Sequence, residues 1–165
     1  MVYIRIKKIS GNEYAYLVES IQTKKGSRQK VKKYLGKVYK FENKNISDVD
    51  KLILSRNRAS FLKDLVLREL VSIGFKDQEK YCNLKLLMFD KNKLTLHKKT
   101  KSKTVKDAII SLNNGFLCSF TLQRILEFKK SKDVNQDAPM LAKYFLEAGL
   151  QVSKENFVKY YMLKV

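Results

Sequence analysis

From Val2 to Ile9 the side chains alternate between apolar and polar, and this period of two constrains the fold more than any other feature. The apolar set is Val2, Ile4 and Ile6, and the polar set is Tyr3, Arg5 and Lys7. Such alternation predicts a β-strand with one buried face. Residues 10–12, Ser-Gly-Asn, then supply turn chemistry, and the alternation resumes from Tyr14 to Ile21.

A second turn at residues 24–26 leads into a third predicted strand, Arg28 to Tyr34. Strict alternation places Arg28, Lys30, Lys32 and Tyr34 on one side, with Gln29, Val31 and Lys33 on the other. Three short strands joined by two glycine-containing turns predict an antiparallel meander. We expect the rest of the chain to cover one of its faces.

The middle of the chain predicts a helix followed by a hairpin. Ser47 and the acids after it suit a helix start, an apolar stripe runs on to Ile73, and Gly74 suits a C-terminal cap. The spacing leaves open one long helix or two helices broken near Asn57. Residues 84–89 and 94–97 predict a basic hairpin, which a lysine-rich run at 98–103 follows.

The last third predicts four short helices that form a bundle, because capping residues recur at helical spacing. Their expected starts are Thr104, Ser119, Asp137 and Ser153. The predicted fold class is therefore α+β: an N-terminal three-stranded antiparallel sheet, a central helix and basic β-hairpin, and a C-terminal four-helix bundle. The matching domains are residues 1–46, 47–104 and 105–165.

The formal net charge of +19 indicates a polyanionic partner, because self-repulsion of this size is best relieved by one. Residues 1–46 carry 12 basic and 3 acidic side chains, and residues 76–104 carry 9 and 3. Arginine supplies only six of the 35 basic residues, which favours contact with phosphates over reading of guanine edges. A lysine-rich surface can also reflect genome composition or a hot habitat, where lysine and glutamate both rise, but Asp and Glu total only 16 here.

Tyrosines interleaved with basic residues form the candidate nucleic-acid site, since rings can stack on bases while lysines contact phosphates. The predicted contacts are Tyr3, Arg5, Lys7, Tyr14, Tyr16, Arg28, Lys30, Lys32 and Tyr34 in the meander, with Lys98, Lys99, Lys101 and Lys103 in the lysine run. Two simpler interpretations compete with this one. Tyrosine also favours strands for packing alone, and the lysine run can be a solvated loop.

No catalytic or metal-binding constellation is found in the sequence. His97 is the only histidine, and Cys82 and Cys118 are far apart and are predicted to be buried, reduced thiols. A helix-turn-helix around Asn114 would offer only Arg124 to base edges. We therefore expect no enzyme activity, no metal and no cofactor. With no signal-peptide pattern and no run long enough to span a bilayer, we expect a cytoplasmic protein without membrane contact.

Three short segments carry a resemblance to a known module. They are Tyr14-Ala15-Tyr16-Leu17-Val18-Glu19-Ser20, Arg28-Gln29-Lys30-Val31 and Lys33-Tyr34-Leu35-Gly36. Through them, residues 3–36 resemble the N-terminal meander of some insertion-sequence transposases and of assorted archaeal proteins. The resemblance implies association with nucleic acid. The rest of the chain has no room for the transposase catalytic domain with its separated metal-binding acids, so transposition is not implied.

The sequence therefore predicts a non-enzymatic, cytoplasmic RNA-binding protein on structured RNA such as ribosomal RNA, with ribosomal proteins as further partners. A DNA-binding protein of transposase or regulatory descent is the first alternative, and an RNA-acting enzyme without a recognisable motif is the second. Lysine dominance and the lack of a DNA-reading helix favour RNA over DNA. Whether the two basic surfaces lie side by side is left open.

Overall fold

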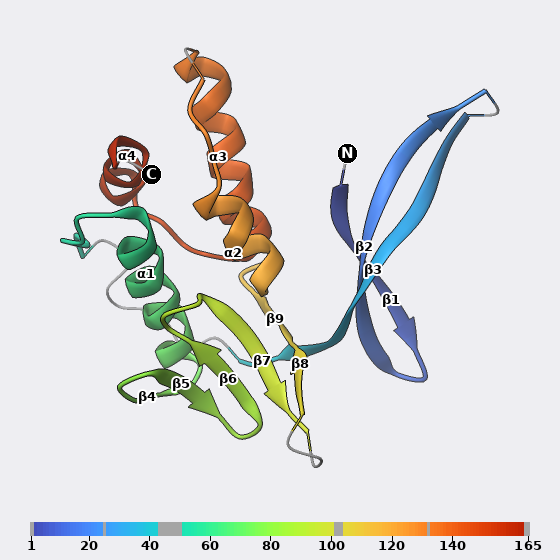
Figure 1. Cartoon of the computed structure of the whole chain (residues 1–165), viewed down its shortest axis with the longest axis horizontal. Helices are drawn as coiled ribbons and strands as arrows, with labels where there is room; N and C mark the ends of the chain where they lie inside the picture. Colours follow the sequence, from blue (N-terminus) through green and yellow to red (C-terminus); the bar gives the residue numbers. More distant parts are fainter. Residues whose placement is uncertain (1, 25, 43–50, 101–103, 132, 164–165) are drawn as a thin grey trace.

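The computed structural model describes residues 2–24, 26–42, 51–100, 104–131 and 133–163. These residues form four helices and two five-stranded sheets, so the architecture is α+β (Figure 1). The helices are α1 (Arg58–Ser72), α2 (Ser119–Leu126), α3 (Val134–Ala148) and α4 (Lys154–Met162). Within the described ranges, none of them combines the length and apolar character needed to cross a membrane.

The first sheet contains the predicted meander and two further strands. Its order is β1 (Val2–Ile9), β2 (Asn12–Thr23), β3 (Gly26–Lys40), β9 (Ile109–Leu112) and β10 (Gly115–Leu117). The predicted three-stranded sheet is therefore wrong. Strand β3 runs six residues beyond Tyr34, and its end pairs in parallel with β9, Val38 opposite Ile109.

The second sheet is antiparallel and follows the order of the chain. Its strands are β4 (Lys76–Asp77), β5 (Tyr81–Leu84), β6 (Leu87–Asp90), β7 (Thr95–Lys99) and β8 (Val105–Asp107). The predicted hairpin corresponds to β6 and β7, and the Asp90 side chain accepts hydrogen bonds from two amides of their connection. Only Ala108 separates β8 from β9, so the chain passes directly from one sheet to the other.

The predicted C-terminal four-helix bundle is also wrong, because residues 105–117 form strands. Val105, Ala108, Ile109 and Leu112 have helical spacing, yet they lie along β8 and β9. The turn after β9 consists of Asn113 and Asn114 with φ of 43° and 66°, which is the backbone of a tight two-residue hairpin. Three helices follow it.

Local capping chemistry sets the helix ends. The Asn57 side chain accepts a hydrogen bond from the Ser60 amide (2.9 Å), so α1 begins there and the preceding residues 51–57 are not helical. Ser47 lies outside the described residues. Gly74 and Gly149, with φ of 98° and 70°, end α1 and α3 as predicted. Helix α3 begins after Asp133, earlier than predicted, and so contains Pro139.

One hydrophobic core joins the four helices, the second sheet and strands β9 and β10. The meander contributes to a smaller cluster, formed by Ala15, Leu35, Val38, Ile109 and Cys118. The meander is therefore attached at one end to the rest of the chain, which we call the body. There the body covers the apolar face of the meander, as expected. Figure 1 shows the far ends of β2 and β3 projecting away from the helices and the second sheet.

A buried carboxylate connects α1 to the C-terminal half of the body. The Asn113 side chain donates to Glu69 (3.1 Å), and the Gln151 amide donates to the other Glu69 oxygen (3.0 Å). Glu69 has no solvent exposure, and its burial raises the pKa above the ordinary value of 4.5 despite both hydrogen bonds. The fold thus holds an acid whose ionisation opposes folding.

Candidate nucleic-acid interface

The register of β1 and β2 places the predicted tyrosines and basic residues on one face, where Arg5 and Lys7 are exposed and the tyrosines are half-buried. Tyr3 lies opposite Val18, Arg5 opposite Tyr16, and Lys7 opposite Tyr14. We call this surface the tyrosine face, defined by Tyr3, Arg5, Lys7, Tyr14, Tyr16 and Tyr34. The opposite face carries the apolar residues Ile4, Ile6, Ala15 and Leu17, which pack with Phe116 and Phe120. The predicted alternation in these two strands is confirmed.

Two bulges in β3 decide which of its residues join the tyrosine face. Tyr34 pairs with Tyr16, but Lys33 pairs with Leu17 and Val31 with Val18, so Lys32 and Leu35 are extra residues. Each extra residue shifts the alternation by one position. Tyr34 therefore joins the tyrosine face, whereas Arg28 and Lys30, opposite Ile21 and Glu19, lie on the other face. The single predicted side for Arg28, Lys30, Lys32 and Tyr34 is wrong.

Three tyrosine rings lie together on this face, with Tyr34 exposed and Tyr14 and Tyr16 half-buried. The Tyr34 ring centroid lies 5.2 Å from that of Tyr16 and 6.4 Å from that of Tyr14, and Tyr34 is 53% exposed. Partial burial, followed by the neighbouring phenols, raises the pKa of Tyr34 above its ordinary value of 10. Its hydroxyl consequently stays neutral at physiological pH.

Basic side chains lie against these rings. The Lys7 ammonium is 5.1 Å from the Tyr16 ring centroid. Arg5 donates to the Gln29 carboxamide, which in turn donates to the Tyr3 hydroxyl. These contacts hold Arg5 and Lys7 beside the tyrosine rings.

The acidic residues of β1–β3 lie on the face opposite the tyrosines. Glu13 and Glu19 occupy that face by register, and each forms an ion pair there, with Lys40 (2.7 Å) and Lys32 (2.7 Å) respectively. The hydrogen bond from Lys32 lowers the pKa of Glu19. Among the described residues of the three strands, the tyrosine face therefore carries cations and no carboxylate.

The second basic segment reaches the end of the tyrosine face. The Lys98 ammonium on β7 lies 5.3 Å from the ring centroid of Tyr39, and Tyr39 is among the phenols that raise the pKa of Tyr34. Lys99 is exposed on β7, opposite Val105. Lys101 and Lys103 lie outside the described residues. The structure thus brings Lys98 beside the meander.

The prediction from sequence missed two residues of this surface, Lys37 and Tyr39. Lys37 is exposed and lies opposite Tyr14, and Tyr39 is half-buried beneath Lys98. Both were missed because the third strand was expected to end at Tyr34. Resumed alternation after Gly36 was the available signal, since a glycine inside a strand often marks a bulge and not an end.

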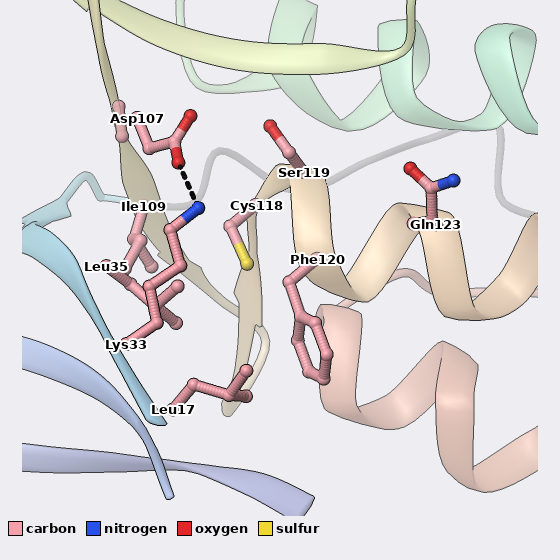
Figure 2. Close-up of a pocket in the computed structure, with 10 residues that line it drawn as sticks. Leu17, Lys33, Leu35, Asp107, Ile109, Cys118, Ser119, Phe120 and Gln123 are labelled. Atoms are coloured by element: carbon pink, nitrogen blue, oxygen red, sulfur yellow. Dashed lines mark hydrogen bonds and ion pairs between the residues drawn. The ribbon is translucent and has the colours of Figure 1, made fainter. Parts of the chain in front are cut away.

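A separate pocket of 260 Å³ lies between the apolar face of the meander and the start of α2. Figure 2 shows Lys33 reaching across to Asp107 (3.1 Å), close to the thiol of Cys118. Cys118 is buried, and burial raises its pKa, so the thiol is protonated and a poor nucleophile. The Ser119 hydroxyl accepts a hydrogen bond from the Leu96 amide (3.2 Å). Lys33 and Cys118 thus take part in the packing of the meander on the rest of the chain, whereas Ser119 joins α2 to β7.

His97 and the cysteines form no metal site in the described ranges, where no group of three or more potential ligands is found. His97 shares a hydrogen bond with the Thr95 hydroxyl (2.8 Å). Cys82 and Cys118 are free and buried, as predicted. Burial raises the pKa of Cys82 to about 11.

The helix-turn-helix considered around Asn114 is not present, because that turn joins two strands. Arg124 on α2 is held within the protein. Its guanidinium bonds to Glu147 (2.5 Å) and lies 4.2 Å from the Tyr144 ring centroid. Helix α2 therefore presents no uncommitted arginine to base edges.

The whole chain was compared with protein-family models, with curated proteins and with solved structures, and no match was found in any of the three.

Proposed function

We propose that the protein is a non-enzymatic RNA-binding protein that stacks unpaired bases of a structured RNA on the tyrosine face. The carrying observation is the cluster of Tyr14, Tyr16 and Tyr34 on one sheet face, with Tyr34 exposed, cations beside the rings and no carboxylate among the described residues of β1–β3. Aromatic side chains on a sheet suit stacking of splayed bases, and neighbouring lysine and arginine suit the phosphates.

RNA is favoured over DNA by the kind of contact that the surface offers. Sequence-specific recognition of RNA targets unpaired loops, whose bases are free to stack on side chains. Reading of duplex DNA usually needs a helix with base-contacting side chains, and Arg124 of α2 is engaged with Glu147. Ribosomal RNA in the cytoplasm, with ribosomal proteins nearby, suits a protein of charge +19.

One observation supports DNA binding as the second candidate. Strands β2 and β3 form a projecting two-stranded ribbon, and the major groove of B-DNA admits such a ribbon. This alternative agrees with the resemblance of residues 3–36 to a transposase module. It would rely on groove contacts by the ribbon and leave the tyrosine rings without a role.

A binding experiment separates these candidates. The purified protein is titrated into an RNA hairpin with an unpaired loop, the same stem closed by a minimal loop, and the DNA duplex of the stem sequence. We expect the looped RNA to bind most tightly, and replacement of Tyr14 and Tyr34 together by alanine to abolish that preference. Preference for duplex DNA would refute the proposal in favour of the alternative.

The same looped RNA, recovered and sized after incubation, tests the absence of enzyme activity, and we expect it intact. Ribosome association is tested by sedimentation of a cell extract at low and high salt. We expect co-sedimentation with ribosomal subunits at low salt and its loss at high salt.

A further inference from the structure

The tyrosine face continues onto the projecting ribbon as a strip of uncharged hydrogen-bonding side chains. Ser20 lies opposite Gln29, and Gln22 lies opposite Ser27. No bulge interrupts the register between these pairs and the pair Val18 and Val31, so all of them share the face of the tyrosines. We call Ser20, Gln22, Ser27 and Gln29 the polar strip.

The polar strip lies where the sheet narrows to two strands. Strand β1 pairs with β2 only as far as Glu19, opposite Val2, and beyond it β2 has β3 as its one described neighbour. Gln22, Ser27 and Gln29 are exposed. The ribbon continues the three-stranded part of the sheet, and its exposed side chains make it accessible to a partner.

Charge is segregated between the two faces of the ribbon. The face opposite the strip carries Glu19, Arg28 and Lys30. The chain carries a net charge of +19, yet the two positions on β2 and the two on β3 that form the polar strip are all uncharged. Cations contact phosphates irrespective of sequence, whereas amides and hydroxyls can read the donor and acceptor pattern of base edges. The two faces therefore suit different parts of a nucleic acid.

Hydrogen bonds hold three of the four side chains of the polar strip, and the Gln22 carboxamide is the one left available. Gln29 is held between Arg5 and Tyr3, and the Ser20 and Ser27 hydroxyls lie 2.9 Å apart. The Gln22 side chain makes no hydrogen bond to any other residue that the structure describes. Its amide offers both a donor and an acceptor, which is the pattern that pairs with the edge of adenine.

We propose that the polar strip is the specificity-determining part of the interface: it hydrogen-bonds the edges of unpaired bases next to those stacked on the tyrosine face. Gln22 is its principal reading residue, and the serine pair supports it. This inference rests on the proposed function. It adds sequence selectivity to a surface whose rings and cations alone would bind bases without regard to sequence.

Selection from a pool of short single-stranded RNAs of random sequence tests it. The wild-type protein is expected to enrich a sequence motif and to bind it at least about fivefold more tightly than oligouridine. Replacement of Gln22 and Ser27 by alanine is expected to reduce this preference to less than about twofold, because binding to the motif weakens more than binding to oligouridine. Gln136→Ala, an exposed glutamine of α3, is the matched control and should keep the motif.

The outcomes separate the inference from the proposed function. Enrichment of the same motif by the doubly substituted protein overturns the inference, as does wild-type binding to RNA without any sequence preference. Both results leave RNA binding itself standing. Failure of the wild-type protein to bind any RNA in the pool overturns the proposed function and the inference with it. Because the Gln22 side chain makes no hydrogen bond to another described residue, Gln22→Ala alone is expected to fold as the wild type does.

Discussion

Replacement of Tyr34 by alanine is the most direct perturbation of the tyrosine face. Tyr34 is the most exposed of the three clustered rings, and it contacts both of the others. Loss of one stacking platform costs about 1–3 kcal/mol of binding free energy per base. The dissociation constant for looped RNA should therefore rise roughly 5- to 150-fold.

The effect on folding should be small by comparison. The substitution removes two cross-strand aromatic contacts, which contribute about 0.2–1 kcal/mol each. A domain with a free energy of unfolding of about 5–15 kcal/mol tolerates that loss. Tyr34→Phe keeps the ring, so its affinity should stay within about twofold of wild type.

Fluorescence anisotropy of a labelled looped RNA measures the affinities, and the chain's own emission adds a second readout. The protein has nine tyrosines and no tryptophan, so quenching of tyrosine emission by stacked bases is not masked. Tyr81→Ala is the matched control, because Lys80 lies 5.2 Å from its ring centroid on the second sheet. Equal losses for Tyr34→Ala and Tyr81→Ala, or no loss for Tyr34→Ala, would refute the reasoning.

Three further predictions test the charges, the backbone and the buried acid. Arg5→Ala with Lys7→Ala should weaken RNA binding and lower the slope of log affinity against log salt by roughly 1.4, measured by salt titration. Gly36→Ala should reduce the free energy of unfolding by about 1–3 kcal/mol in urea, because φ is 122° and the new Cβ would lie 3.1 Å from the Asp107 carbonyl oxygen. The Glu69 pKa is raised, so its contribution to stability is fully present below the unfolded value and is lost as pH rises through the folded one. The stability of wild type relative to Glu69→Gln should thus fall as pH rises above 4.5 in urea titrations, and a constant difference would contradict it.

Local sequence patterns predicted the elements in which periodicity, turn residues and capping residues agree. Alternation and turn residues located β1 and β2, and capping residues located the ends of α1 and α3 and the start of α4. Residues 105–112 misled because their apolar spacing fits a helix. Val105, Ile109 and Ile110 are β-branched, however, and the neighbouring strands β3 and β7 supply partners for them. Those partners are distant in sequence, so propensity alone could not show the outcome.

The candidate site was predictable in its composition and not in its arrangement. The sequence shows the tyrosines and the cations, but the face of each β3 residue depends on where its two bulges fall. The contact between Lys98 and Tyr39 depends on the parallel pairing of β3 with β9, across about 70 residues of chain. Apart from Gly36, which lies beside the bulge at Leu35, no local sequence pattern indicates the bulges or the contact between Lys98 and Tyr39.

The bulges give the meander its two chemically distinct faces. With strict alternation, Tyr34 would lie on the same side as Arg28, Lys30 and Lys32. It would then no longer contact Tyr14 and Tyr16. The extra residue Lys32, which lies between Val31 and Lys33, instead places Tyr34 opposite Tyr16 and near Tyr14, and the Lys32 side chain forms an ion pair with Glu19. Bulges are often placed where a side chain must be re-aimed at a functional site. The shift in register at Lys32 is thus the structural step on which the aromatic surface, and with it the proposed binding of bases, depends, and the shift at Leu35 places Lys37 on the same face, opposite Tyr14.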